Sequence, residues 1–218
     1  MIRSVSLDTL VHRSRPPAGE AEGALVLLHG RGTSEDDLFP LIDILDPERR
    51  LAAFTLRGPL RLPPGGYHWY RLAGIPTPDP ETFLSTFKLA ASWLEALPED
   101  VGVPPERTVL GGFSQGSVMS YALGLGEGRP SPAGILALSG FLPSVPGFRL
   151  DLESRTGLPV ASGHGTHDPV IGVEFGRAAR RQLEEAGLAV TWRETPMGHS
   201  VDPRYLAELA GWMRRVVP

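Results

Sequence analysis

A five-residue motif, Gly-Phe-Ser-Gln-Gly at positions 112–116, constrains the fold of this chain more than any other feature. It follows a short β-prone run (108–110) and precedes a segment with the composition of a helix. A G-x-S-x-G sequence between a strand and a helix is typical of a nucleophile elbow, a sharp turn that holds a serine in a strained backbone conformation. The residues two before and two after that serine must be small, as Gly112 and Gly116 are. Ser114 is therefore the candidate nucleophile, and the alternative interpretation is a tight turn with an ordinary serine.

Strand-like and helix-like segments alternate along most of the chain. Short apolar or β-prone runs predict strands at 24–28, 51–56, 108–110, 135–138, 158–161 and 188–192, and the continuous apolar run 24–28 is expected to be buried on both faces. Helical spacing and helix-boundary residues predict helices at 34–46, 81–97, 172–186 and 203–216, and residues 2–11 are expected to form an edge strand. This alternation predicts an α/β fold with a mostly parallel central sheet and helices on both faces. Site residues are then expected just after the strands, at their carboxyl ends.

Length and composition limit the class of protein. A chain of 218 residues is long enough for one well-buried domain, so residues 1–218 are expected to form a single domain. No apolar run approaches the roughly 20 residues that a membrane span needs, and the first residues lack the apolar core of a signal peptide, so a cytoplasmic location is expected. The absence of cysteine excludes disulfides and a thiol nucleophile, and a net charge of −4 argues against nucleic-acid binding.

A serine hydroxyl needs a base to take its proton, and the base needs a carboxylate to orient it. Of six histidines, His199 is the best placed, in a loop between the last expected strand and the last expected helix, where Gly198 lets the loop bend. Asp168 follows the strand expected at 158–161 and is the candidate carboxylate. The alternatives are a solvated loop histidine and a turn aspartate before proline. Asp202 is instead expected to cap the last helix.

Two further groups of residues are expected near the nucleophile. The backbone N–H groups of Arg31 and Gln115 are the candidate oxyanion donors, because one lies in the loop after the first buried strand and the other follows the nucleophile. His29, at the end of that strand, is expected to be structural. The long proline-rich stretch 57–80 should lie over the catalytic face, with four side chains as candidate walls of an acyl pocket: Tyr67, Trp69, Tyr70 and Ile75. The alternative is that the aromatic rings only anchor this loop to the core.

At four places the sequence resembles the phospholipase/carboxylesterase family of α/β-hydrolases, which includes acyl-protein thioesterases and small bacterial carboxylesterases. The matching segments are 28–32, 112–116, 164–170 and 198–199. The resemblance implies an α/β-hydrolase fold without a separate lid domain, and hydrolysis of carboxylic esters of small molecules through an acyl-enzyme. It also implies that neither metal nor cofactor is needed and that a homodimer forms. Ser117 replaces a second glycine of many members, and Arg31 replaces a frequently apolar residue, which argues against long-acyl or protein substrates.

Other functions remain open at this point. His164, His167 and Asp168 could together bind a metal ion, although this would leave the serine motif unexplained. Phosphate binding at 111–116 is disfavoured because the segment lacks both the G-K-[ST] ending of a P-loop and the glycine spacing of a dinucleotide-binding fold. A peptidase or a lipase could use the same triad, and a binding protein with the same fold could have lost turnover.

Overall fold

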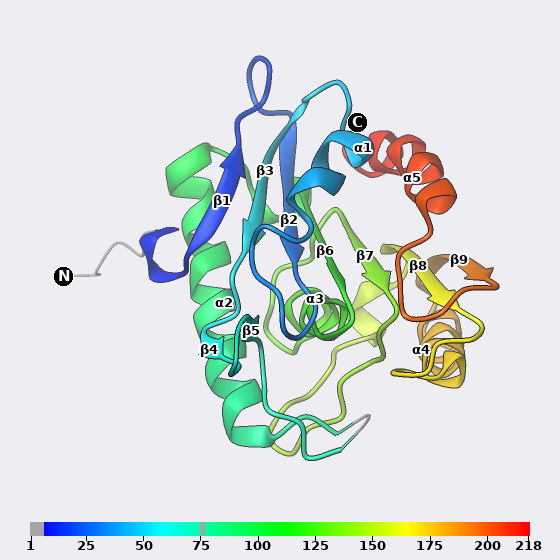
Figure 1. Ribbon diagram of the computed structural model, residues 1–218. Coiled ribbons are helices and arrows are strands. Elements are labelled where there is room, and N and C mark those ends of the chain that lie inside the picture. The colour runs from blue at the N-terminus through cyan, green and yellow to red at the C-terminus, as the bar shows by residue number, and fades with distance from the viewer. Residues whose placement is uncertain (1–6, 75–76) are drawn as a thin grey trace.

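The computed structural model describes residues 7–74 and 77–218 (Figure 1). Nine strands are present in this part of the chain: β1 His12–Arg15, β2 Gly23–Leu28, β3 Leu51–Leu56, β4 Leu60–Arg61, β5 Tyr67–His68, β6 Thr108–Phe113, β7 Gly134–Leu138, β8 Pro159–Gly165 and β9 Ala189–Thr195. The α-helices described are α1 Ile42–Leu45, α2 Pro80–Val101, α3 Gln115–Leu125, α4 Val173–Glu185 and α5 Pro203–Val216. Short 3₁₀ turns occupy Leu7–Thr9, Phe39–Leu41, Pro105–Arg107 and Glu153–Arg155.

Seven strands form one twisted sheet in the order β1-β3-β2-β6-β7-β8-β9. Strand β1 is antiparallel to β3, and every other pair in this sheet is parallel. The strands β2, β3, β6 and β7 consist almost entirely of buried residues, because helices cover both faces of the sheet. The sequence prediction of a mostly parallel α/β sheet is therefore confirmed.

Helices lie on both faces of the sheet (Figure 1), and alternate residues of the central strands pack against the two opposite helix layers. On one face Val26 and Leu110 pack with residues of α2 and α3, and α4 continues this layer toward β8. On the other face Leu25 and Val109 pack with α1 and α5. The carboxyl ends of the parallel strands thus all lie at one edge of the sheet, and Ser114 lies at this edge because it directly follows β6.

Two local predictions differ from the structure. The expected edge strand at 2–11 lies partly outside the described residues, and the actual edge strand is β1, which begins at His12. The expected helix at 34–46 is wrong over most of its length: residues 39–41 form a 3₁₀ turn and only Ile42–Leu45 is α-helical. The acidic residues after Ser34 resemble a helix start, but they form ion pairs with distant arginines. Asp36 pairs with Arg13, and Glu35 pairs with Arg57. Tertiary ion pairs therefore overrode the local helix signal.

The stretch 57–79 is not a separate lid in the part that the structure describes. It contains the small antiparallel hairpin β4–β5, which pairs with the loop after β2 through a bridge between Thr33 and Tyr67. The N–H of Gly32 donates to the carbonyl of Tyr67 over 2.8 Å, and the N–H of Tyr67 donates to the carbonyl of Thr33 over 2.8 Å. The hairpin is thus joined by backbone hydrogen bonds to the loop that carries Arg31.

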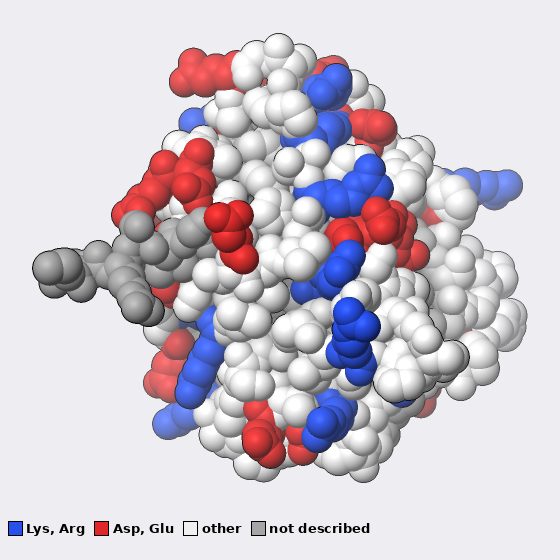
Figure 2. Space-filling model, turned by 60° about the vertical axis from the view of Figure 1, so that its left-hand side comes forward, with Lys and Arg blue, Asp and Glu red and all other residues white. Residues whose placement is uncertain are grey.

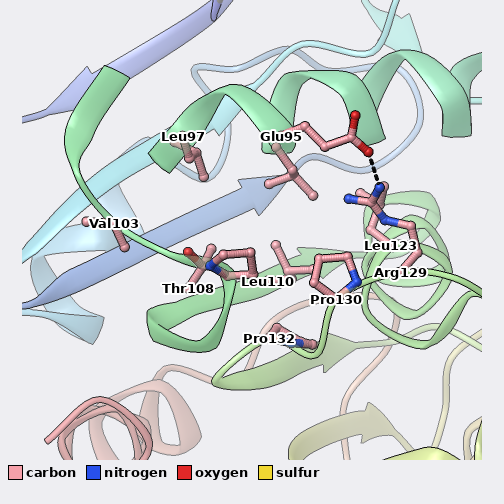
Figure 3. A pocket seen from close by; sticks show the side chains of 11 residues that line it. Glu95, Leu97, Val103, Thr108, Leu110, Leu123, Arg129, Pro130 and Pro132 are labelled. Carbon is pink, nitrogen blue, oxygen red and sulfur yellow. Dashed lines mark hydrogen bonds and ion pairs between the residues drawn. The ribbon is translucent and has the colours of Figure 1, made fainter. Parts of the chain in front are cut away.

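An apolar cavity of about 40 Å³ lies between α2, the start of β6 and the loop before β7 (Figure 3). Leu97, Val103 and Leu110 are among the side chains around it, and an ion pair of 2.5 Å between Glu95 and Arg129 lies at its edge. The cavity opens near Thr108, at the amino end of β6, whereas Ser114 follows the carboxyl end of that strand. It is therefore separate from the candidate active site.

We expect Val103→Ile to stabilise the protein. The added methylene enters the cavity and contributes up to about 1 kcal/mol of hydrophobic free energy. The free energy of unfolding in urea measures this effect. Val118→Ile is the matched control: Val118 is completely buried in the closely packed core, so the same enlargement there should destabilise by about 1 kcal/mol or more. Equal destabilisation by both substitutions would contradict the prediction.

Charged side chains of both signs are interspersed on the face that Figure 2 shows, with uncharged residues over most of the remaining surface. Within the described residues, no helix combines the length and apolar character that crossing a membrane requires.

Candidate active site

The turn between β6 and α3 holds Ser114 in a backbone conformation that non-glycine residues rarely adopt, with φ of 57° and ψ of −119°. Its N–H donates to the carbonyl of Leu138 over 2.9 Å, which ties the turn to β7. Ser114 is 6% exposed and stands at the amino end of the eleven-residue helix α3. The free N–H groups and positive dipole end of this helix therefore lie beside the hydroxyl.

The two glycines of the motif are needed for close approach of backbone to backbone. A side chain at Gly116 would overlap the carbonyl oxygen of Leu28, and one at Gly112 would overlap the backbone of Gly116. Any larger residue would push the turn away from β2. The strained position of Ser114 thus depends on both glycines, for the reason that the sequence suggested.

Ser114, His199 and Asp168 form a continuous line of hydrogen bonds. His199 Nε2 lies 2.9 Å from Ser114 Oγ, and its Nδ1 lies 2.6 Å from Asp168 Oδ2. The ring of Phe113 packs against the imidazole with a centroid separation of 4.7 Å. An Nδ1–H that donates to the carboxylate leaves Nε2 free to accept the serine proton.

The carboxylate of Asp168 is locked by its own loop. Oδ1 accepts the N–H groups of Val170 and Ile171 over 2.8 and 2.9 Å, and the side chain is completely buried. Burial acts to raise the pKa of Asp168, but the hydrogen bonds from His199 and from these two N–H groups outweigh it and hold that pKa below its usual value. The group is therefore an anion at neutral pH, as an acceptor for Nδ1–H must be.

The loops that carry Asp168 and His199 are joined by their backbones. His167 N–H donates to the carbonyl of Met197 over 3.0 Å. The sequence predicts that Gly198 lets the histidine loop bend, but a Cβ at Gly198 would make only ordinary contacts. The glycine that close packing requires here is Gly165, where a side chain would overlap the carbonyls of Met197 and Gly198. Asp202 caps α5 as expected, because its Oδ1 accepts the N–H of Arg204 over 2.9 Å.

The loop after β2 passes directly beside the nucleophile. A Cβ at Gly30 would lie 3.5 Å from the Cβ of Ser114, so the loop that carries Arg31 approaches the nucleophile closely. His29 is buried and structural: its Nε2 accepts the N–H of Gly58 over 2.9 Å, and its Nδ1 donates to Gly30 O over 2.6 Å. Burial lowers the pKa of His29, which keeps Nε2 available as an acceptor.

The aromatic residues proposed as pocket walls occupy different environments. Trp69 and Tyr70 are 0% and 1% exposed and pack in the core with Phe83, so in this structure they present no surface to a substrate and fit the anchoring alternative. Tyr67 is half-buried, and its ring stacks under the guanidinium of Arg57. Ile75 lies outside the described residues.

The side chain of Gln115 has a function that sequence reasoning missed. Its Oε1 accepts the N–H of Trp69 over 3.1 Å, and its Nε2 donates to the carbonyl of Tyr70 over 2.9 Å. The indole N–H of Trp69 also donates to the carbonyl of His29 over 2.8 Å. The segment 69–70 is thus fixed to both loops that carry the candidate oxyanion donors. No periodicity in the sequence signals these bonds, because they join residues about 45 positions apart.

Gln115→Leu is expected to lower the free energy of unfolding by about 2–3 kcal/mol. The substitution leaves a buried N–H of Trp69 and a buried carbonyl of Tyr70 without partners, at about 1–3 kcal/mol for each group. Gln182→Leu is the control, since Gln182 is exposed on α4 and its replacement should change stability by less than about 0.5 kcal/mol. Urea denaturation of both variants tests this, and equal stability would refute it.

Two of the residues considered as metal ligands, His164 and Asp168, make other contacts in this structure. His164 is buried, with Nε2 2.8 Å from the carbonyl of Ile171 and 3.6 Å from Asp168 Oδ2. Asp168 itself is bound by His199 and by backbone N–H groups. Among residues 7–74 and 77–218, no three His, Cys, Asp or Glu side chains are grouped so that they could hold a metal ion.

A parallel sheet with a serine on a strand–turn–helix elbow, followed in the chain by an aspartate loop and a histidine loop, defines the class of α/β-hydrolases. Within this class, residues 13–216 match the model of the phospholipase/carboxylesterase family. The chain therefore belongs to this family, whose members are serine hydrolases that act on esters.

Two relatives and one solved structure are similar to this chain in a way that agrees with the family assignment. Acyl-protein thioesterase 1 of Gibberella zeae is 38% identical over 125 residues, which are 55% of this chain and 52% of that protein, so the chain matches about half the length of this relative. Lysophospholipase-like protein 1 of Mus musculus is 26% identical over 98% of this chain and 96% of its own. The crystal structure of a carboxylesterase from Bacillus cereus has the same fold, with a TM-score of 0.81, 22% identity and coverage of 95% of this chain and 94% of that chain.

Proposed function

We propose that this protein is a serine carboxylesterase that hydrolyses carboxylic esters through an acyl-enzyme on Ser114. The observation that carries the proposal is the line of hydrogen bonds from Ser114 through His199 to Asp168. In the first half-reaction Ser114 Oγ attacks the acyl carbon while His199 Nε2 takes its proton. The tetrahedral intermediate then expels the alcohol, which leaves with that proton, and the acyl group stays on Ser114.

In the second half-reaction a water molecule attacks the acyl-enzyme. His199 Nε2 accepts a proton from this water and returns it to Ser114 Oγ as the carboxylic acid leaves. Asp168 holds Nδ1–H throughout and stabilises the imidazolium. The N–H groups of Arg31 and Gln115 donate to the oxyanion, a function supported by the position of Gly30 beside Ser114 and by the location of Gln115 at the start of α3. These steps require neither a metal ion nor a cofactor.

The test is hydrolysis of p-nitrophenyl esters with acyl chains from two to about sixteen carbons, together with labelling by a fluorophosphonate probe. We expect turnover on short or medium chains and a probe adduct on the peptide that contains Ser114. Turnover that peaks on long chains would favour a lipase or a lysophospholipase instead. Neither turnover nor labelling would replace the enzyme proposal with a binding protein of the same fold.

Thioesters are the second candidate substrates, because relatives such as the Gibberella zeae protein are named acyl-protein thioesterases. A matched pair of a butyryl oxyester and a butyryl thioester separates the two functions. A kcat/KM that is higher for the thioester by more than the difference in intrinsic reactivity would identify a thioesterase. A peptidase would instead cleave a matched amide.

The proposal also covers the domain organisation, the kind of substrate and the partners of this protein. We infer that residues 1–218 act as one α/β-hydrolase domain on a small-molecule ester, without a nucleic-acid partner. Homodimerisation and a cytoplasmic location remain predictions. Light scattering coupled to size-exclusion chromatography checks the first, and fractionation of the source cells checks the second.

A further inference from the structure

Three exposed arginines lie in the loop after β2 and in the stretch 57–79, two segments that pair through Thr33 and Tyr67. Arg31, Arg61 and Arg71 are exposed, and none of them takes part in an ion pair with the other residues that the structure describes. Arg13 and Arg57, by contrast, are paired with Asp36 and Glu35. The charge of Arg71 helps to lower the pKa of Asp79 after the hydrogen bonds from Thr82, but no direct ion pair with a described residue occupies its guanidinium, so all three groups keep donors for an anion.

Arg31 and Arg71 are each one residue away from a group that touches the nucleophilic turn. Arg31 follows Gly30, where a Cβ would lie 3.5 Å from the Cβ of Ser114. Arg71 follows Tyr70, whose carbonyl accepts the side chain N–H of Gln115 over 2.9 Å. The two arginines therefore lie on two loops whose backbones approach or bind the nucleophilic turn.

A buried histidine between these loops reports the local charge. His68 is only 6% exposed, and its Nδ1 has no hydrogen-bond partner among the described residues. Its pKa is lowered by burial first, and then by the positive charges of Arg31 and Arg71. The charges of Arg31 and Arg71 thus both act on this one buried side chain, although the whole chain has a net charge of −4.

We propose that Arg31 and Arg71 make this site selective for esters that carry an anionic group, a carboxylate or a phosphate, near the ester bond. Guanidinium groups donate paired, charge-assisted hydrogen bonds to both kinds of anion. A neutral acyl chain would gain nothing from them, and a long one would have to desolvate them. The inference rests on the proposed esterase function and specifies its substrate class.

The experiment compares esters that carry an anionic group with neutral esters of similar size. For the acyl side, p-nitrophenyl hemiglutarate is compared with the neutral p-nitrophenyl pentanoate, which has the same chain length. For the alcohol side, 4-acetoxybenzoate and 4-acetoxyphenyl phosphate are each compared with methyl 4-acetoxybenzoate. The ratio of kcat/KM for the anionic ester to that for the neutral ester is measured in the wild type, Arg31→Gln, Arg71→Gln and Arg181→Gln. Arg181 is the control, an exposed arginine on α4 in no ion pair with described residues.

We expect the wild type to prefer the anionic ester of at least one pair by about tenfold at low salt, and each site variant to lower that ratio about three- to tenfold. Arg181→Gln should leave the ratio unchanged. An increase from about 20 mM to about 500 mM NaCl should also reduce the ratio, because mobile ions screen exposed charges. The arm that shows the preference identifies the anion and the side of the ester bond on which it lies.

The ratio separates this inference from the proposed esterase function and from misfolding. If the arginines only stabilised the oxyanion, Arg71→Gln would lower kcat/KM for both esters equally and leave the ratio constant, which would overturn the inference. A wild type that hydrolyses the neutral esters but shows no preference for any anionic ester would overturn it too, with the esterase function intact. Absence of turnover on every ester would instead contradict the proposed function itself.

Discussion

Ser114→Ala is expected to lower kcat for ester hydrolysis by about 10⁴-fold or more, with little change in KM. The substitution removes the atom that forms the acyl-enzyme and leaves His199 without a proton donor at 2.9 Å. Residual catalysis can then come only from substrate binding and from oxyanion donors acting on attack by water. Steady-state kinetics on a p-nitrophenyl ester measure the loss, and the fluorophosphonate probe should no longer label the protein.

Ser117→Ala is the matched control for this substitution. Ser117 lies one turn further along α3, is completely buried, and has a hydroxyl with no partner among the described residues. Removal of that hydroxyl should leave kcat within about twofold of the wild type, because no hydrogen bond is lost. Comparable losses of activity in both variants would mean that the helix, not the Ser114 hydroxyl, is responsible, and Ser114 would not be the nucleophile.

Asp168→Asn is expected to lower kcat by about 10⁴-fold as well, with the fold preserved. The two N–H groups of Val170 and Ile171 require an oxygen at the Oδ1 position. The NH₂ group of the asparagine must then face His199 Nδ1, which would have to become an acceptor. This forces the proton onto Nε2, and a protonated Nε2 cannot take the proton of Ser114. Steady-state kinetics and a denaturation curve measure the two parts of this prediction.

Asp202→Asn is the control for the aspartate substitution. Asp202 caps α5 near the same loop, and asparagine is as good an N-cap as aspartate, so activity should be retained. Nearly full activity of Asp168→Asn would show that the carboxylate does not set the tautomer of His199. The low pKa of Asp168 also implies that loss of activity on mild acidification does not come from protonation of this group.

Much of the fold follows from local sequence patterns. The apolar runs that predicted strands correspond to β2, β3, β6, β7, β8 and β9. For the central strands β2, β3, β6 and β7 the reason is that a strand covered on both faces must be apolar, whereas β9 is an edge strand without a fully buried residue. The last helix was predicted at 203–216 and observed as Pro203–Val216, since Asp202 and Pro203 mark its start unambiguously. The segment 34–46 was predicted incorrectly because its acidic residues bind distant arginines.

The sequence by itself determined the candidate triad, because a sharp strand-to-helix turn needs its two glycines, and parallel strands bring residues that follow them to one edge of the sheet. It could not determine the function of Gln115, the burial of Trp69 and Tyr70, or the requirement for Gly165. These depend on contacts between segments far apart in the chain, which no periodicity encodes. Only the tertiary structure decided that the segment 69–70 is fixed to the nucleophilic turn, because hydrogen bonds from the side chain of Gln115 set its position.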